Sequence, residues 1–126
     1  MSIITYKVKV DSDGSKEWYL NDKLHREDGP AVELADGSRA WYLNGKFHRE
    51  DGPAIEYPDG SKYWYLNDEF HREDGPAVER ADGSRAWYLN GVEYTEEEFN
   101  KEMLTTVEMT IAEIEALVGK KVKVVK

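Results

Sequence analysis

The three histidines of the chain recur at a fixed spacing that suggests a metal site. His25, His48 and His71 each follow the last by 23 residues. Equivalent positions two strands apart in a sheet lie about 9–10 Å from each other, whereas a zinc ligand must come within about 2.1 Å of the ion. Two of these side chains therefore cannot share one ion. We expect no metal site and no cofactor, and each imidazole is predicted to hydrogen-bond loop backbone, close to the Arg and Asp of the same loop.

Each histidine opens a loop that also contains Arg, Glu and Asp. Paired carboxylates can perform acid–base catalysis, but three identical copies argue against it, because an enzyme needs one asymmetric constellation. The aspartates before Gly-Pro are instead expected to hold the turn through their own backbone, and the loop arginines to pair with them or with the carboxylates of the neighbouring loop. We predict that the chain is not an enzyme and has no catalytic residue. The predicted structural loop residues are His25, His48, His71, Asp28, Asp51 and Asp74.

A longer repeat must position these loops. Asp-Gly-Ser recurs every 23 residues, and so does the tetrapeptide Trp-Tyr-Leu-Asn, which begins at Trp18, Trp41, Trp64 and Trp87. A fixed period in this range is typical of one supersecondary unit stacked on copies of itself. The sequence therefore predicts a repeat protein.

One unit shows how the repeat folds. Residues 54–57 and 61–67 favour strands, and Asp59-Gly60 between them predicts a two-residue hairpin turn. That turn pairs Ile55 with Trp64, and Glu56 with Tyr63. The predicted faces are Ile55, Trp64 and Leu66 on one side, and Ala54, Glu56, Tyr63 and Tyr65 on the other.

The predicted fold class is mainly β: a single-layer antiparallel β-meander of 23-residue repeats with a small C-terminal α-helical cap. Residues 1–94 form the sheet, with a strand at 2–10, repeats at 18–40, 41–63 and 64–86, and a partial repeat at 87–94. Tight turns lie on one edge and the longer histidine loops on the other. A tryptophan ladder interleaved with Val32, Ile55 and Val78 is expected on one face, and a ladder of Tyr19, Tyr42, Tyr65 and Tyr88 on the other.

Residues 95–126 predict the cap. Thr95 with Glu98 fits a capping box, and Phe99 with Met103 forms the apolar stripe of a short helix. A second helix is predicted from Thr110, and residues 120–126 are expected to form a last strand or tail. The cap is expected to cover the end of the sheet or one of its faces.

Composition excludes several classes of protein. The chain has 126 residues, no cysteine and a formal net charge of -9, so a disulfide scaffold and a thiol nucleophile are excluded. The acidic balance disfavours direct binding to nucleic acid or to an anionic membrane. The dense acidic stretch 93–98 suits a helix N-terminus, with mimicry of nucleic acid as its alternative. A cytoplasmic location is expected.

The repeat resembles a known family. Residues 44–48, followed by a strand ending in Pro58-Asp59-Gly60, resemble the MORN repeat (membrane occupation and recognition nexus), a 23-residue unit of two strands with an Asn-Gly turn and a downstream His. Where that family has Gly-x-Gly after the histidine, this chain has the longer segment 49–53. Over residues 13–91 it more closely resembles a MORN-like variant, Trp-Tyr-Leu-Asn-Gly-x-x-His-Arg-Glu-Asp-Gly-Pro-Ala, that is frequent in small proteins of tailed bacteriophages and giant viruses. The resemblance implies a viral binding protein.

The favoured function is a non-catalytic viral protein that engages or inhibits a host protein, such as a component of a defence system, in the host cytoplasm. One alternative is a sponge for a cyclic-nucleotide immune signal, in which aromatic rings stack on bases and arginines hold phosphates. A structural or scaffold protein is a further alternative. The candidate binding residues are Trp18, Trp41, Trp64, Trp87, Tyr42, Tyr65, Arg26, Arg49 and Arg72.

A homo-oligomer is also expected. A sheet one layer thick has two faces, and the predicted cap offers too little apolar surface to cover both. The tryptophan ladder with Val32, Ile55 and Val78 is predicted to extend beyond the cap. Exposed apolar side chains in a large patch draw a partner, and the most available partner is another copy.

Overall fold

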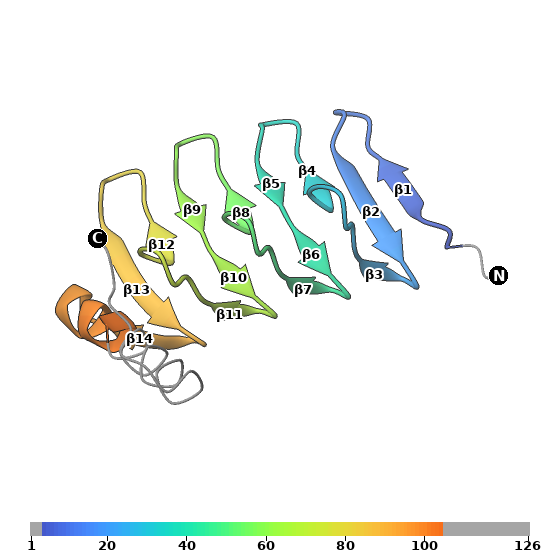
Figure 1. The fold of residues 1–126 in the computed structure, drawn as a ribbon. Coiled ribbons are helices and arrows are strands. Elements are labelled where there is room, and N and C mark those ends of the chain that lie inside the picture. Colours follow the sequence, from blue (N-terminus) through green and yellow to red (C-terminus); the bar gives the residue numbers. More distant parts are fainter. Residues whose placement is uncertain (1–3, 105–126) are drawn as a thin grey trace, which may run out of the picture.

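A computed structural model of the chain describes residues 4–104. It confirms the mainly β fold: an open antiparallel sheet with one short helix, residues 96–104, at its C-terminal end (Figure 1). The main sheet has the order β1-β2-β4-β5-β8-β9-β12-β13-β14, with β3 paired to β2, while β6-β7 and β10-β11 form separate hairpins. The strands are β1 (Lys7–Val10), β2 (Lys16–Leu20), β3 (Lys23–Leu24), β4 (Val32–Glu33), β5 (Arg39–Ala40), β6 (Tyr42–Leu43), β7 (Lys46–Phe47), β8 (Ile55–Glu56), β9 (Lys62–Tyr63), β10 (Tyr65–Leu66), β11 (Glu69–Phe70), β12 (Val78–Glu79), β13 (Arg85–Leu89) and β14 (Val92–Tyr94).

The Asp-Gly turns on one edge are three-residue loops, not the two-residue turns predicted. The Gly60 N–H donates to the Tyr57 carbonyl at 3.0 Å, and the Tyr57 N–H donates to the Ser61 carbonyl at 3.0 Å. Only Gly60 has positive φ, at 95°, while Asp59 keeps negative φ. This is a type I turn followed by a left-handed glycine. The Asp59 carboxylate also accepts the Ser61 N–H at 2.8 Å, which fixes the turn.

The extra turn residue shifts the strand register by one, so the predicted pairing is wrong. Ile55 lies opposite Tyr63, and Glu56 opposite Lys62. Since neighbouring residues of a strand point to opposite faces, a slip of one residue moves every side chain of that strand to the other face. Ile55 therefore shares a face with Tyr63 and Tyr65, and the predicted interleaving of the tryptophans with Val32, Ile55 and Val78 is also wrong.

The other edge is closed by tight two-residue turns, where long loops were predicted. Asn67 and Asp68 both have positive φ, at 49° and 68°, and Leu66 pairs with Glu69 across them. Positive φ at both central residues defines the type I′ turn of a hairpin. The equivalent turns follow Leu20, Leu43 and Leu89.

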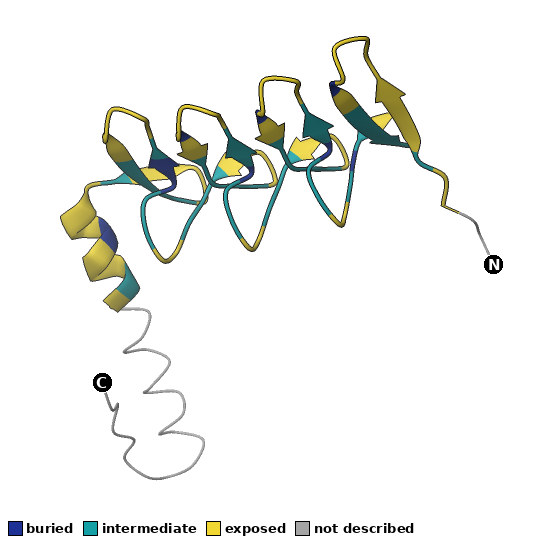
Figure 2. Ribbon diagram, turned by 90° about the horizontal axis from the view of Figure 1, so that it is seen from above, coloured by how far each residue is buried: buried dark blue, intermediate teal, exposed yellow. Residues whose placement is uncertain are grey.

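The histidine loops leave the sheet from the middle of a strand, not from its edge. β3 and β4 both pair with β2, so together they fill one position across the sheet, interrupted by residues 25–31. The segments between β7 and β8 and between β11 and β12 repeat this arrangement. Residues 26–30, 49–53 and 72–76, called here the face loops, project from the same side of the sheet as the helix (Figure 2). We call this side the loop face.

The opposite side, called here the aromatic face, carries a ladder of stacked and tilted rings. Ring centroids are 4.4 Å apart for Tyr42–Phe47, 5.0 Å for Phe47–Tyr65, 4.4 Å for Tyr65–Phe70 and 4.8 Å for Phe70–Tyr88. The tyrosine ladder was predicted on this face, but the phenylalanines that complete it were not. Burial raises the pKa of Tyr42 and of Tyr65 above the usual value.

The helix at the C-terminal end begins with the predicted capping box, which is confirmed. The Thr95 N–H donates to the Glu98 carboxylate at 2.9 Å, and the Glu98 N–H donates to the Thr95 hydroxyl at 3.1 Å. The hydrogen bond from the Thr95 N–H lowers the pKa of the Glu98 carboxyl. Phe99 is buried, at 4 % exposed. Helices were expected only after about residue 94, and within the described residues this holds.

Two predictions fall outside the described residues. They are the second helix, predicted from Thr110, and the last strand or tail at 120–126. Within residues 4–104, no helix is long and apolar enough to cross a membrane.

Candidate functional site

The backbone of each tryptophan holds a face loop at the two points where it leaves and rejoins the sheet. The His25 N–H donates to the Trp18 carbonyl at 3.0 Å, and the Trp18 N–H donates to the Ala31 carbonyl at 2.8 Å. Trp41 and Trp64 hold the next two loops in the same way. The alanine that ends each loop has no exposed surface. The three loops therefore share one geometry because the tryptophan that holds them recurs in each repeat.

The arginine of each face loop folds back over the tryptophan ring. The Arg49 guanidinium carbon lies 3.8 Å from the ring centroid of Trp41, and the corresponding distances for Arg26–Trp18 and Arg72–Trp64 are 4.0 and 3.9 Å. Nη1 of Arg49 donates to the Pro53 carbonyl at 3.0 Å. A Cβ at Gly52 would meet the guanidinium carbon at 2.9 Å, so glycine leaves room for this closure. The arginine thus serves as the clasp of its own loop.

The loop aspartates pair with this arginine, as one of the two predicted pairings had it, and the predicted role of holding the turn by their own backbone needs correction. Asp51 Oδ1 accepts from Arg49 Nε at 3.0 Å, and the same pair recurs as Arg26–Asp28 and Arg72–Asp74. These aspartates are 85–87 % exposed, so each ion pair stabilises the loop only weakly. A further contact joins Arg49 to Glu56 on β8 at 3.4 Å.

The histidines link each repeat to the next. Nδ1 of His25, His48 and His71 accepts the backbone N–H of Asn44, Asn67 and Asn90, respectively, at 2.9–3.1 Å. Each Nε2 lies 3.7–4.0 Å from the glutamate two residues later. His25 is 5 % exposed, and its Nε2 has no hydrogen-bond partner. In the described part of the chain, no group of three or more potential metal ligands gathers.

Two clefts lie between successive face loops. The first has a volume of about 620 Å³ and is lined by Arg26, Glu27 and Asp28 of one loop, by the floor residues Trp41 and Leu43, and by His48, Arg49, Glu50 and Asp51 of the next loop. The second, about 720 Å³, is lined by the equivalent residues one repeat later, with Trp64 and Leu66 as its floor. Both combine an apolar floor with charged walls.

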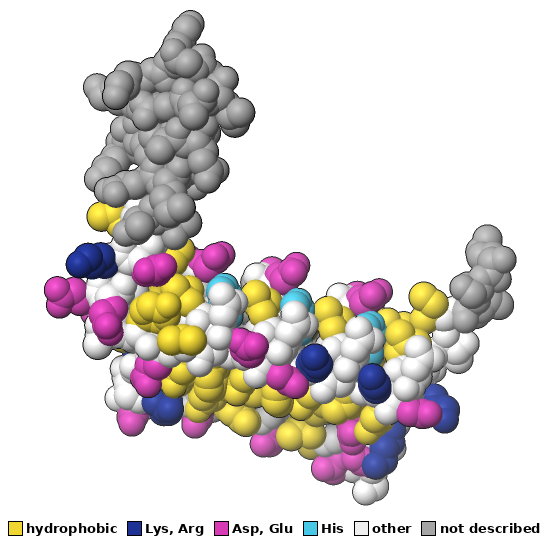
Figure 3. Space-filling view, turned by 90° about the horizontal axis from the view of Figure 1, so that it is seen from below, with side chains coloured by type: hydrophobic (Ala, Val, Ile, Leu, Met, Phe, Trp, Pro, Cys, Tyr) yellow, Lys and Arg dark blue, Asp and Glu magenta, His cyan; other side chains and the backbone are white. Residues whose placement is uncertain are grey.

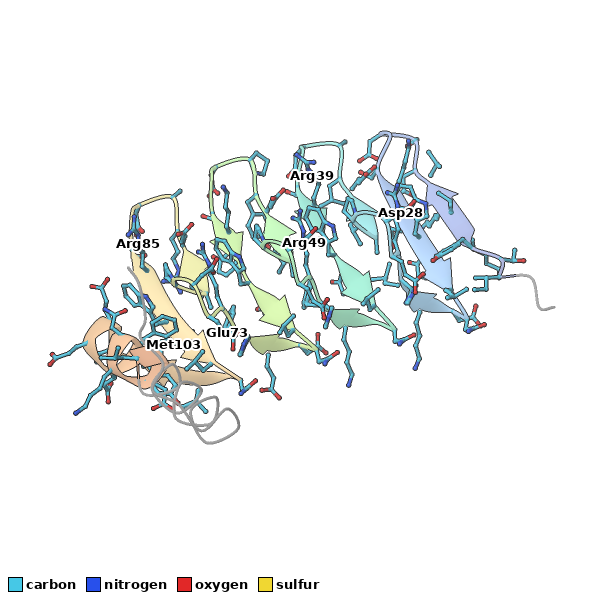
Figure 4. The ribbon with its side chains drawn as sticks, viewed as in Figure 1. Asp28, Arg39, Arg49, Glu73, Arg85 and Met103 are labelled. Atoms are coloured by element: carbon cyan, nitrogen blue, oxygen red, sulfur yellow. The ribbon has the colours of Figure 1, made fainter. Side chains whose placement is uncertain are left out.

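The outer rim of the clefts is acidic. Glu27, Glu50 and Glu73 are 70–83 % exposed, while the arginine charges are directed inward onto the indole rings. Figure 3 shows acidic side chains beside each histidine along the molecule, and Figure 4 shows Asp28, Arg49 and Glu73 of successive loops following one another along the sheet. Successive rim carboxylates are separated by two strand spacings, about 9–10 Å. The loop face therefore offers a periodic negative edge.

The helix 96–104 takes the place of a fourth face loop. Trp87 has no following loop, and it lines a pocket of about 310 Å³ together with Phe99 and Met103 of the helix and with Glu73 and Asp74 of the last loop. Figure 4 shows Met103 next to Glu73. Apolar side chains of the helix thus line the space beside the last tryptophan. The row of clefts therefore ends at Trp87.

The candidate binding residues divide between the two sides of the sheet. The tryptophans and arginines meet on the loop face, whereas Tyr42 and Tyr65 lie on the aromatic face and cannot join them in one site. Leu66 was predicted on the face of Trp64, but neither it nor Leu43 was among the candidate binding residues, although each stands two residues after a tryptophan and so shares its face in a strand. The rim glutamates, which recur with the same period, were predicted as part of the charged loops and not as binding residues.

Comparison with known proteins gives no assignment. No protein-family model matches the chain, and no curated protein or solved structure matches it significantly. The resemblance to MORN-like repeats therefore stays a prediction.

Proposed function

We propose that the chain is a non-catalytic binding protein whose loop face engages a basic surface of another protein. The observation that carries this proposal is the pair of clefts, each with an apolar floor of Trp and Leu and an exposed glutamate on its rim. An aromatic floor surrounded by charge is a common composition of a protein-binding hot spot. The periodic acidic rim selects a partner that carries Lys or Arg opposite it.

The arginines favour this function over a nucleotide sponge. Arg26, Arg49 and Arg72 each direct Nε and Nη1 to acceptors of their own loop, and each covers a tryptophan ring. A phosphate would have to displace these contacts and approach the rim carboxylates. Binding of an anion would therefore cost the contacts that close the loop.

The resemblance of the repeat to viral MORN-like proteins supports a host protein as the partner. On that basis we propose a viral protein that acts in the host cytoplasm and inhibits a host component, such as part of a defence system. The acidic segment 93–98 has a structural use, since Glu98 caps the helix, so the rim of the face loops is the stronger candidate for contacting the partner.

Affinity capture from host lysate tests the proposal. The immobilised full chain is compared with a triple variant E27Q/E50Q/E73Q, which neutralises the rim at exposed positions and leaves Arg49–Asp51 and its equivalents intact. The matched control is Glu69→Gln on β11, an exposed carboxylate outside both clefts. The wild type and the control should retain one host protein, in amounts that fall with rising salt, and the triple variant should lose it.

Four outcomes contradict the proposal. Capture of no protein across several host strains, or equal capture by the triple variant, argues against partner binding on this face. Saturable binding of a cyclic nucleotide in calorimetry replaces the proposal with the sponge. Co-sedimentation with virus particles favours a structural or scaffold protein.

A further inference from the structure

The aromatic face is a continuous apolar surface that no other described element covers. By the pairing register, every strand residue on this side from β3 to β13 is uncharged. The central residues include Val32, Tyr42, Phe47 and Ile55, with Leu34 and Tyr57 exposed at 45 % and 46 % along one margin. A hydrophobic band is visible along the molecule in Figure 3. The helix 96–104 lies on the loop face and leaves this surface open.

We propose that a second copy of the chain packs on the aromatic face, with the two sheets related by a twofold axis. This differs from the oligomer expected from the sequence, which used the tryptophan ladder. Three of the four tryptophans on the loop face, Trp18, Trp41 and Trp64, are covered by their arginines, so the Tyr–Phe ladder is the side that needs a partner. The inference is independent of the proposed function, since the loop face stays free in such a dimer.

The available area matches a stable dimer. The uncharged region spans about six neighbouring strand positions, which at ~4.8 Å each, and about six residues of ~3.3 Å along the strands, gives ~600 Å² on each copy. A specific interface buries about 1,200–2,000 Å² in total. Two aromatic faces therefore reach the lower end of that range from the uncharged region alone, and the charged ends of the face extend it.

The ring geometry indicates apolar packing as the use of this surface. Phe47 lies between Tyr42 and Tyr65, and Phe70 between Tyr65 and Tyr88, at centroid distances of 4.4–5.0 Å. The ring faces are thus occupied by one another, and mainly the ring edges are left for a partner. A base or a sugar, which stacks on a ring face, finds no free platform in this ladder.

The charges at the ends of the aromatic face select the orientation. By register, Lys7, Lys9 and Glu17 lie on this side at the N-terminal end, two positive charges against one negative, and Glu93 lies on it at the C-terminal end. A twofold axis parallel to the strands places the lysines of one copy against Glu93 of the other. An axis across the strands would oppose lysine to lysine, which is unfavourable. The two sheets therefore lie with their strand order reversed.

Light scattering on the full chain at tens of micromolar tests the dimer. The wild type should have twice the 14.5 kDa mass of one chain. The variant L34K/Y57K places two charges on an already exposed margin of the face and should raise the dimer Kd by about tenfold or more. The control Val92→Lys removes an even more exposed apolar side chain, 57 % exposed. It pairs with Leu89 and lies on the loop face, so this variant should stay dimeric.

A charge exchange tests the orientation. K7E/K9E and E93K should each weaken the dimer, and the triple variant K7E/K9E/E93K should recover it, because the opposed charges are exchanged together. Circular dichroism confirms that each variant is folded. A monomeric wild type, or an L34K/Y57K variant that stays dimeric, overturns the inference. Failure of the triple variant to recover overturns the reversed strand order.

Discussion

Replacing Arg49 with Ala is expected to destabilise the protein through the loss of one loop clasp. Arg49 lies in the central loop, 22 % exposed, with its guanidinium 3.8 Å from the Trp41 ring centroid and Nη1 3.0 Å from the Pro53 carbonyl. Truncation removes both contacts and opens the indole to water. The neighbouring loops keep their own arginines, so the effect is confined to one repeat.

The magnitude follows from the separate contacts. A partly buried cation–π contact contributes about 1 kcal/mol, and a hydrogen bond from a charged donor to the loop carbonyl about 1 kcal/mol in this half-buried site. The ion pairs with Asp51 and Glu56 add about 0.5 kcal/mol, because Asp51 is almost fully exposed. We expect a loss of about 2–3 kcal/mol in the free energy of unfolding. Arg49→Lys keeps the charge but not the planar fork, so it should recover less than half of the loss.

Urea unfolding followed by tryptophan fluorescence measures this difference. The matched control is Arg39→Ala, which removes an exposed arginine whose nearest carboxylate, Glu56, is 3.8 Å away. The control should cost about 0.5 kcal/mol or less. If Arg49→Ala costs no more than Arg39→Ala, the arginine does not hold the loop onto the tryptophan, and the argument for preformed clefts fails.

Three further predictions concern the turns and the helix. Gly60→Ala should cost about 1–2 kcal/mol in urea unfolding, because φ is 95° there and an L side chain is strained. The hydrogen bond from the Ser38 N–H lowers the pKa of Asp36. The ionised carboxylate therefore stabilises the fold above the usual carboxyl pKa, and this stabilisation is lost as pH falls through the folded-state pKa. The free energy of unfolding, measured between about pH 5 and pH 2, should fall less steeply in Asp36→Asn than in the wild type. Thr95→Ala should destabilise the helix by about 1 kcal/mol and reduce the helical circular dichroism signal, whereas a surface change such as Glu97→Gln should not.

The repeat could be predicted from the sequence, because identical residues recur at a fixed period of 23 residues. The same positions carry Trp, Asp-Gly and Asn in every unit, and each of these types has a specific local use. The capping box Thr95–Glu98 was equally predictable, since both partners lie within one helical turn. Predictions from such local sequence patterns hold because few long-range contacts favour a different local structure.

The faces of the sheet could not be predicted with the same success. Asp59-Gly60 is compatible with a two-residue or a three-residue loop, and the choice depends on whether Asp59 takes positive φ. Because the loop is one residue longer than predicted, Ile55 pairs with Tyr63 instead of Trp64. The position of the face loops was missed for a related reason: Gly-Pro was taken as the end of the strand pairing, whereas Pro53 lies inside a loop that returns to the same line of the sheet at Ala54.

The backbone hydrogen bonds at the two ends of a face loop determine which residues of the chain can be changed. Because the His48 N–H and the Ala54 carbonyl bond to the same residue, Trp41, the exit and the return of the chain are fixed independently of what lies between them. Replacements at positions 50 and 51 keep Arg49 and Gly52 in place and are expected to leave the strand register unchanged. The fold thus separates a fixed framework from short exposed segments presented side by side, an arrangement suited to grafting new recognition sequences in the laboratory.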